Sequence, residues 1–141
     1  MELRSLRPEE VDTIVEIHAA TATAAYAGIF PPDSPFPIER TRRRWGSFEG
    51  TVTVAEEAGR VIGFIAHGDQ QLHALYVLPE FWDRGVGARL LEAAGPVSEL
   101  WVLAGNERAR RFYERRGWLP DGAERSAFGV QELRYRRNGA R

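Results

Sequence analysis

The sequence predicts an α/β fold, in which a mixed sheet carries helices on both faces. Apolar runs around residues 51–66 are typical of a hairpin, residues 72–94 read as strand, turn and helix, and residues 99–135 repeat strand and helix before closing strands. This order of elements favours helices packed on the two faces of one sheet. The length of 141 residues predicts one domain, residues 1–141.

The first residues are expected to form a strand and a long helix. Residues 3–7 predict a short opening strand, and Pro8-Glu9-Glu10 begins a helix with proline and acids in its first turn. An apolar stripe then continues as far as Tyr26. His18 lies on that stripe, which is typical of a histidine in the core.

A loop, a second helix and a hairpin follow. Four prolines make residues 28–37 a loop, and residues 38–48 predict a short helix with Trp45 packed inward. The basic side chains of this helix are expected to form a solvated face: Arg40, Arg42, Arg43 and Arg44. Residues 51–55 and 61–66 predict a hairpin, and His67-Gly68-Asp69 is expected to turn the chain into a central strand at residues 72–78.

The second half is predicted to alternate strands and helices. Apolar residues at helical spacing predict a helix from Val86, which Gly95-Pro96 ends. Residues 99–103 predict a short buried strand. Asn106 caps the next helix, and Gly117 ends it as a left-handed cap. Trp118 and the run at residues 128–135 are expected to supply the closing strands.

Composition excludes several kinds of chemistry. The formal net charge of −1 implies no general attraction to nucleic acid or membranes, and we expect neither as a partner. The absence of cysteine excludes disulfides, thiolate metal sites and a cysteine nucleophile, and we expect no metal. All 19 basic residues are arginine, so covalent lysine chemistry is excluded as well. No stretch reads as a membrane span or signal peptide, which predicts a cytoplasmic protein.

The turn before residue 86 has the features of an anion-binding site. Gly85 and Gly87 leave the backbone bare where a helix begins, and the first N–H groups of a helix lack internal partners at its positive end. Arg84 and Arg89 flank the turn and could add full charges. A tight turn that binds no ligand could have the same sequence. A dinucleotide fingerprint would need another glycine or alanine where Leu90 stands, and no P-loop lysine follows.

Two motifs around this turn resemble those of the GNAT superfamily of N-acetyltransferases. The first is Pro79-Glu80-Phe81-Trp82-Asp83-Arg84-Gly85-Val86-Gly87-Ala88-Arg89-Leu90-Leu91, which is similar to the acyl-CoA-binding motif. The second follows at the usual separation: Leu100-Trp101-Val102-Leu103, then Asn106, Ala109, Phe112-Tyr113 and Gly117-Trp118. The resemblance covers residues 50–136 well. It implies the GNAT acyl-CoA N-acyltransferase fold, a mostly antiparallel central sheet with splayed strands.

The resemblance also implies acetyl-CoA as co-substrate. Whether the donor carries an acetyl group or a longer acyl group is left open. Backbone N–H groups of residues 83–88 would bind the pyrophosphate, and strand residues would pair with pantetheine and polarise the thioester carbonyl. Trp82 departs from the family, which usually has glutamine or arginine there. The residues expected to bind the cofactor are Leu75, Tyr76, Val77, Asp83, Arg84, Gly85, Val86, Gly87, Ala88, Arg89, Asn106 and Ala109.

Acetyl transfer also needs an acid and a base. Tyr113 is the expected acid, because a phenol stays protonated at neutral pH and can protonate a departing thiolate. Family members often carry a glutamate at the position of Gln71. The glutamine present here cannot act as a base. His73 lies on the same face of the strand and is the nearest substitute. Asp69, His67 and a chain of waters remain alternatives.

The acceptor is expected to be a primary amine of a small molecule or peptide, attacking directly in a ternary complex. The first two helices and their loop would bound its site, with Tyr26, Phe36, Trp45 and Gln71 as candidate contacts and His18 nearby. Two other functions remain open: a non-catalytic acyl-CoA sensor or interaction domain, and a nucleotide-binding regulatory domain. The oligomeric state, a homodimer included, is also open.

Overall fold

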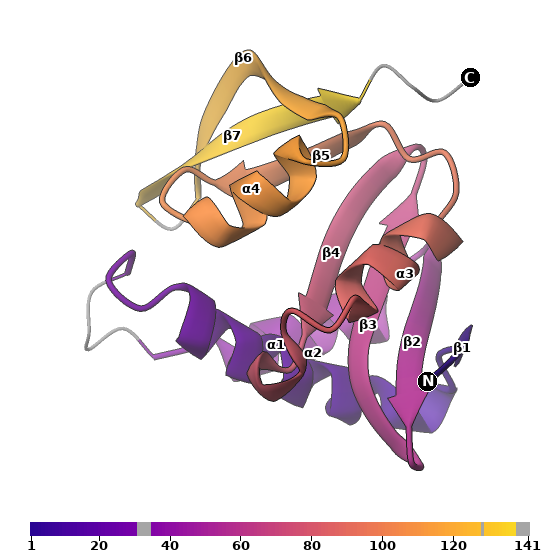
Figure 1. Cartoon of the computed structure of the whole chain (residues 1–141). Helices are drawn as coiled ribbons and strands as arrows, with labels where there is room; N and C mark the ends of the chain where they lie inside the picture. The colour runs from indigo at the N-terminus through magenta and orange to yellow at the C-terminus, as the bar shows by residue number, and fades with distance from the viewer. Residues whose placement is uncertain (31–34, 128, 138–141) are drawn as a thin grey trace.

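Seven strands form one sheet in a computed structural model that describes residues 1–30, 35–127 and 129–137. The strands are β1 (Glu2–Ser5), β2 (Thr51–Glu57), β3 (Arg60–Gly68), β4 (Gln71–Val77), β5 (Glu99–Leu103), β6 (Trp118–Ala127) and β7 (Val130–Arg137). Their order in space is β1-β2-β3-β4-β5-β7-β6 (Figure 1). Only β4 and β5 pair in parallel, so the expected mixed, mostly antiparallel sheet is confirmed.

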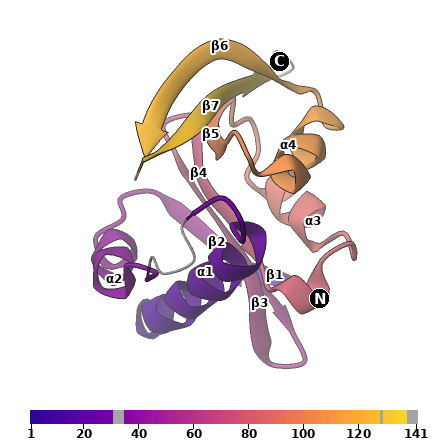
Figure 2. The same cartoon turned by 90° about the vertical axis from the view of Figure 1, so that its left-hand side faces the viewer.

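Helices cover both faces of the sheet, as predicted. They are α1 (Val11–Ala25), α2 (Ile38–Gly46), α3 (Val86–Ala93) and α4 (Glu107–Glu114), with short 3-10 turns at Pro8–Glu10 and Pro79–Phe81. Figure 2 shows α1 and α2 on one side of the strands and α3 and α4 on the other. None of the described helices is long and apolar enough to cross a bilayer.

The core lies between β3 and the helices on either side of it. Residues 61–66 of β3 are all buried, which explains their continuous apolar character. Ile14 contributes from α1 and Leu90 from α3, and both side chains are fully buried. Each such side chain contributes about 1.5–3 kcal/mol of transfer free energy. This packing fixes the N-terminal end of α3 beside the end of β4.

The pairing of β4 with β5 is limited to one end. Gln71 pairs with Glu99 and Leu72 with Leu100, and the ladder then stops. The Leu78 N–H donates to the Ile62 carbonyl across the β3 side at 2.9 Å. Because successive N–H groups point to opposite edges of a strand, those of Val77 and Leu75 point into the gap between β4 and β5. The expected splay is therefore present.

Several boundaries differ from the sequence-based expectations. β1 ends at Ser5, and Pro8–Glu10 forms a 3-10 turn before α1 begins. His67 and Gly68 belong to β3, so the turn is made by Asp69 and Gln70, whose φ angles are 51° and 67°. His67 pairs with Thr51 of β2 and Gly68 with Gln71 of β4, so the strand continues through the glycine. The predicted loop and closing strand include residues 31–34 and 128, which lie outside the described residues.

The gap predicts a specific pattern of amide hydrogen exchange. The N–H groups of Leu75 and Val77 should exchange at least about 100-fold faster than those of Ala74 and Tyr76, which face β3. Residue-resolved exchange measured by NMR on the unliganded protein tests this. Equal protection along the four residues would mean that the gap closes in solution.

Candidate active site

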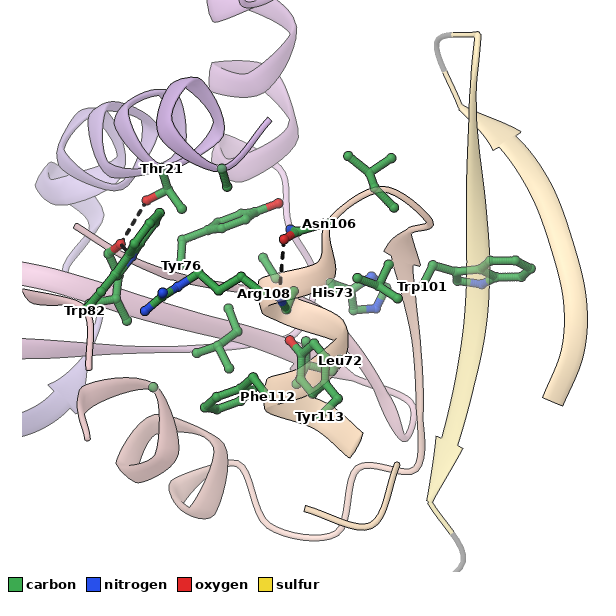
Figure 3. Close-up of a pocket in the computed structure, with 18 of the residues that line it drawn as sticks. Thr21, Leu72, His73, Tyr76, Trp82, Trp101, Asn106, Arg108, Phe112 and Tyr113 are labelled. Atoms are coloured by element: carbon green, nitrogen blue, oxygen red, sulfur yellow. Dashed lines mark hydrogen bonds between the residues drawn. The ribbon is translucent and has the colours of Figure 1, made fainter. Parts of the chain in front are cut away.

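A cavity of about 660 Å³ follows the gap between β4 and β5. Its walls come from α1, α2, β4, the turn before α3, β5, α4 and the β6–β7 hairpin. Figure 3 shows Trp82 at one end, Trp101 at the other, and Tyr113 of α4 between them. The sequence motifs singled out above therefore line one continuous space.

The turn before α3 forms a cradle of unpaired amides at the Trp82 end. Gly85 caps α3 with φ at 80°, a conformation that favours glycine. A Cβ on Gly87 would lie 3.5 Å from the Phe112 ring, an ordinary van der Waals contact, so α4 packs close to this turn. Within the described chain, no main-chain N–H of residues 83–88 donates to another protein atom. These amides sit at the positive end of a helix and suit a phosphate.

Three of the arginines that line the cavity come from α4 and the residues just after it, and not from the two positions that flank the turn. The Arg84 guanidinium lies over Phe81, 5.3 Å from the ring centre, and Arg89 reaches the Met1 carbonyl at 3.5 Å. Neither lines the cavity. Arg108, Arg115 and Arg116 do, although the sequence analysis did not select them.

Trp82, which departs from the family motif, forms a hydrogen bond to the end of β4. Its Nε1–H donates to the Val77 carbonyl at 2.7 Å, and the Thr21 hydroxyl donates to the same oxygen at 3.2 Å. Arg108 lies 4.2 Å over the indole ring and pairs with Asp83 at 3.0 Å. The Val77 carbonyl is thus occupied, which leaves the N–H groups of Leu75 and Val77 to meet a ligand.

The other expected cofactor contacts mostly line the same cavity. Tyr76, Val86, Ala88 and Ala109 are among the lining residues. Asn106 also lines it while capping α4, since its Oδ1 accepts from the Ala109 N–H at 3.2 Å. Asn106, the helix cap predicted from the sequence, therefore lies at the cavity.

Tyr113 projects from α4 into the middle of the cavity. Its ring packs edge-on against Phe112 and Trp118, and only 7% of the residue is exposed. Burial, and to a smaller degree the nearby Tyr76, raises the pKa of the Tyr113 hydroxyl. The phenol is therefore protonated throughout the physiological range and available as a proton donor.

His73 and Gln71 line the cavity together on β4. Burial and the Arg44 cation lower the pKa of His73 below its ordinary value, so the ring is neutral at pH 7. The alternatives Asp69 and His67 are not among the lining residues. Of the side-chain bases considered, the structure brings only His73 to this space.

The expected acceptor contacts divide into two groups. Tyr26 and Gln71 line the cavity, and burial raises the pKa of the Tyr26 hydroxyl. Phe36 and Trp45 lie behind the wall instead. Trp45 is buried and donates its Nε1–H to His18 Nδ1 at 3.1 Å, while Phe36 packs edge-on against the His18 ring. Core packing explains these two aromatic residues.

Charged and aromatic residues that sequence reasoning missed complete the Trp101 end. Arg44 is exposed, as expected for the arginine face of α2, and it also lines the cavity. Trp101, Arg125 and Glu132 line it from the last three strands. Arg125 lies 4.2 Å over the Trp101 ring and pairs with Glu132 at 2.7 Å. The pairing of β7 with β5 brings Glu132 to the gap, and the pairing of β6 with β7 adds Arg125.

Comparison with known proteins identifies the family of this chain. Residues 48–119 match the model described as acetyltransferase (GNAT) domain. An uncharacterized N-acetyltransferase of Archaeoglobus fulgidus is 31% identical over 137 residues, which cover 80% of this chain and 89% of that protein. The chain belongs to the GNAT family of acetyltransferases, which confirms the resemblance noted in its motifs and the expectation of an enzyme.

Solved structures agree with this assignment. The apo form of YjaB from Escherichia coli matches with a TM-score of 0.77 and 26% identity, covering 99% of this chain and 98% of that one. The PaiA N-acetyltransferase of Thermoplasma acidophilum, solved in complex with coenzyme A, matches with a TM-score of 0.73 and 21% identity. That match covers 96% of this chain and 98% of the other. The fold is shared along nearly the whole chain.

The two histidines near Arg44 should both titrate below their ordinary value of 6.5. Burial and Arg44 lower the pKa of His18 to about 4, and the same two causes lower that of His73. The substitution Arg44→Gln removes a cation and should raise both values. NMR titration of the ring protons measures this, and unchanged midpoints would show that Arg44 does not face these rings.

The His18 shift has a consequence for stability. The folded state binds fewer protons than the unfolded chain between the two pKa values, so stability is lost as the pH falls from about 6.5 towards 4. Lowering the pH from about 6.5 to 5 should cost about 1 to 2 kcal/mol from this group. Urea unfolding at the two pH values gives the measurement. No loss of stability would contradict a buried, neutral His18.

Proposed function

We propose that this protein transfers an acetyl group from acetyl-CoA to a primary amine of a small molecule or peptide, by direct attack in a ternary complex. The observation that carries the proposal is one cavity with three parts. Unpaired amides of residues 83–88 lie at one end, the free N–H groups of Leu75 and Val77 lie along one wall, and Tyr113 lies between the ends. Strands from both halves share one sheet, which supports a single domain over residues 1–141.

The donor fits the Trp82 half of this cavity. The diphosphate would accept from the amides at the start of α3, with Arg108 and Arg116 as nearby cations. The pantetheine arm would follow β4 and accept hydrogen bonds from its free N–H groups. The Thermoplasma acidophilum neighbour, which shares this fold, was solved in complex with coenzyme A, which supports coenzyme A as the ligand.

The thioester carbonyl would then lie beside Leu75. Its N–H points into the gap and can donate to the carbonyl oxygen, which becomes more negative as the tetrahedral intermediate forms. The amide is held rigidly because β4 pairs with β3 on the opposite edge. A preorganised donor of this kind lowers the barrier without having to reorient during the reaction.

In the transfer step the acetyl group moves from the sulfur of acetyl-CoA to the nitrogen of the amine. The amine nitrogen forms a bond to the carbonyl carbon, the carbon–sulfur bond breaks, and the sulfur leaves with a proton from Tyr113. Tyr113 regains a proton from the nitrogen of the tetrahedral intermediate. The proton lost when the ammonium becomes an amine goes to neutral His73 and then to water, so the net products are an amide, free CoA thiol and one proton.

A negative charge in the cradle should separate ligand binding from folding. Asp in place of Ala88, in the first turn of α3, is favourable for the helix but repels a diphosphate. Ala88→Asp should weaken CoA binding at least about 10-fold by titration calorimetry and leave the melting temperature equal or higher.

Ala88→Asn is the matched control, because it has nearly the same shape without the charge. It should bind CoA more tightly than the aspartate variant. Equal affinities for the two variants would contradict a diphosphate in the cradle.

Removal of one oxygen tests the acid. Tyr113→Phe keeps the ring contacts with Phe112 and Trp118 but loses the hydroxyl, so free-thiol release from acetyl-CoA with an accepted amine should slow by about 100-fold. CoA affinity measured by calorimetry should change little. A variant as fast as the unmodified protein would remove Tyr113 from the mechanism, and CoA binding without thiol release for any amine would favour the sensor alternative.

A further inference from the structure

We propose that the acceptor is a zwitterion, a primary amine that also carries a carboxylate, as a free amino acid does. Arg44 would bind the carboxylate and Glu132 the ammonium group. This inference rests on the proposed function and names the substrate class of the same cavity.

Arg44 is the cation available to an anionic group at the acceptor end. Its guanidinium lies 4.5 Å from the centre of the Trp45 ring, and one nitrogen donates to the His73 carbonyl at 3.2 Å. Among the described residues no Asp or Glu forms a salt bridge with it. The ring and the carbonyl orient the guanidinium, while its charge is not neutralised. A carboxylate at the cavity would supply the missing partner.

Glu132 is a carboxylate that lines the same cavity from β7. Its side chain is only 16% exposed, and Arg125 donates to one oxygen, Oε1. In the described part of the chain no donor reaches the second oxygen, Oε2. That oxygen is suited to an ammonium group, which needs acceptors and brings a positive charge.

Arg44 and Glu132 line the same cavity as Tyr76. The Tyr76 ring stacks on His18 at 4.3 Å and is thereby fixed in position. Tyr26 and Trp101 also line the cavity here. A small zwitterion would thus meet opposite charges across an aromatic floor.

The same arrangement disfavours other amines. A polyamine would bring a second positive charge to Arg44, where like charges repel. A simple amine has no carboxylate to pair with the guanidinium, so it would gain no binding free energy from Arg44. Selectivity would therefore come from Arg44, while Glu132 would serve every acceptor.

The test compares matched acceptors. Each of the common amino acids is assayed with its carboxamide and with the amine that lacks the carboxylate, using acetyl-CoA and thiol release. At least one amino acid should exceed both partners by about 10-fold in kcat/KM. Arg44→Gln should bring that ratio close to one, Arg44→Lys should restore part of it, and Arg43→Gln, on the same helix but outside the cavity, should leave it unchanged. Glu132→Gln should lower kcat/KM for all three compounds without changing the ratio.

The outcomes separate the two proposals. Thiol release that is equal or faster with the carboxamide or the simple amine would overturn the zwitterion inference and leave the transferase intact. A ratio that survives Arg44→Gln, in a variant whose melting temperature is unchanged, would overturn the role of Arg44. The absence of thiol release with every amine, while CoA still binds, would overturn the proposed function and this inference with it.

Discussion

The arrangement of the whole molecule depends on a sheet that stops pairing in its middle. Two residue pairs join β4 to β5, after which the strands separate. Backbone N–H groups at such a gap are costly to bury unless something accepts their hydrogen bonds. The protein keeps the gap open because β4 is held by β3 on one edge and β5 by β7 on the other. A ligand with amide and phosphate groups is the natural partner of the groups left free.

In the proposed function, the charge along the gap would sort the two substrates. Backbone amides and the arginines of α4 collect positive potential at the Trp82 end, where a diphosphate fits. The Trp101 end holds the ion pair of Arg125 with Glu132, and Arg44, which has no carboxylate partner among the described residues. Each end thus favours a different ligand. The reacting atoms would meet between them, beside Tyr113.

The sequence was most informative where chemistry depends on neighbours along the chain. Gly85 before a helical pattern located the cradle, Asn106 located a helix cap, and the strand at residues 99–103 was predicted with its bounds. It was least informative where partners come from distant segments. Glu132 reaches the cavity only because β7 pairs with β5, and Arg44 only because α2 packs beside α1. Trp45 looked like a substrate contact because an aromatic residue has the same spacing whether it faces a ligand or His18.

The hydrogen bonds to the Val77 carbonyl have a further effect on what the open edge of β4 admits. An unpaired strand is a template for other polypeptides, and such edges drive aggregation unless they are protected. Trp82 and Thr21 cap the acceptor that an incoming strand would need for a continuous ladder. A polypeptide must both donate and accept at alternate positions, whereas a thin amide-bearing arm can bind by accepting alone. Two side chains thereby disfavour strand addition at the Val77 end of the edge, while the N–H groups of Leu75 and Val77 stay free for a ligand.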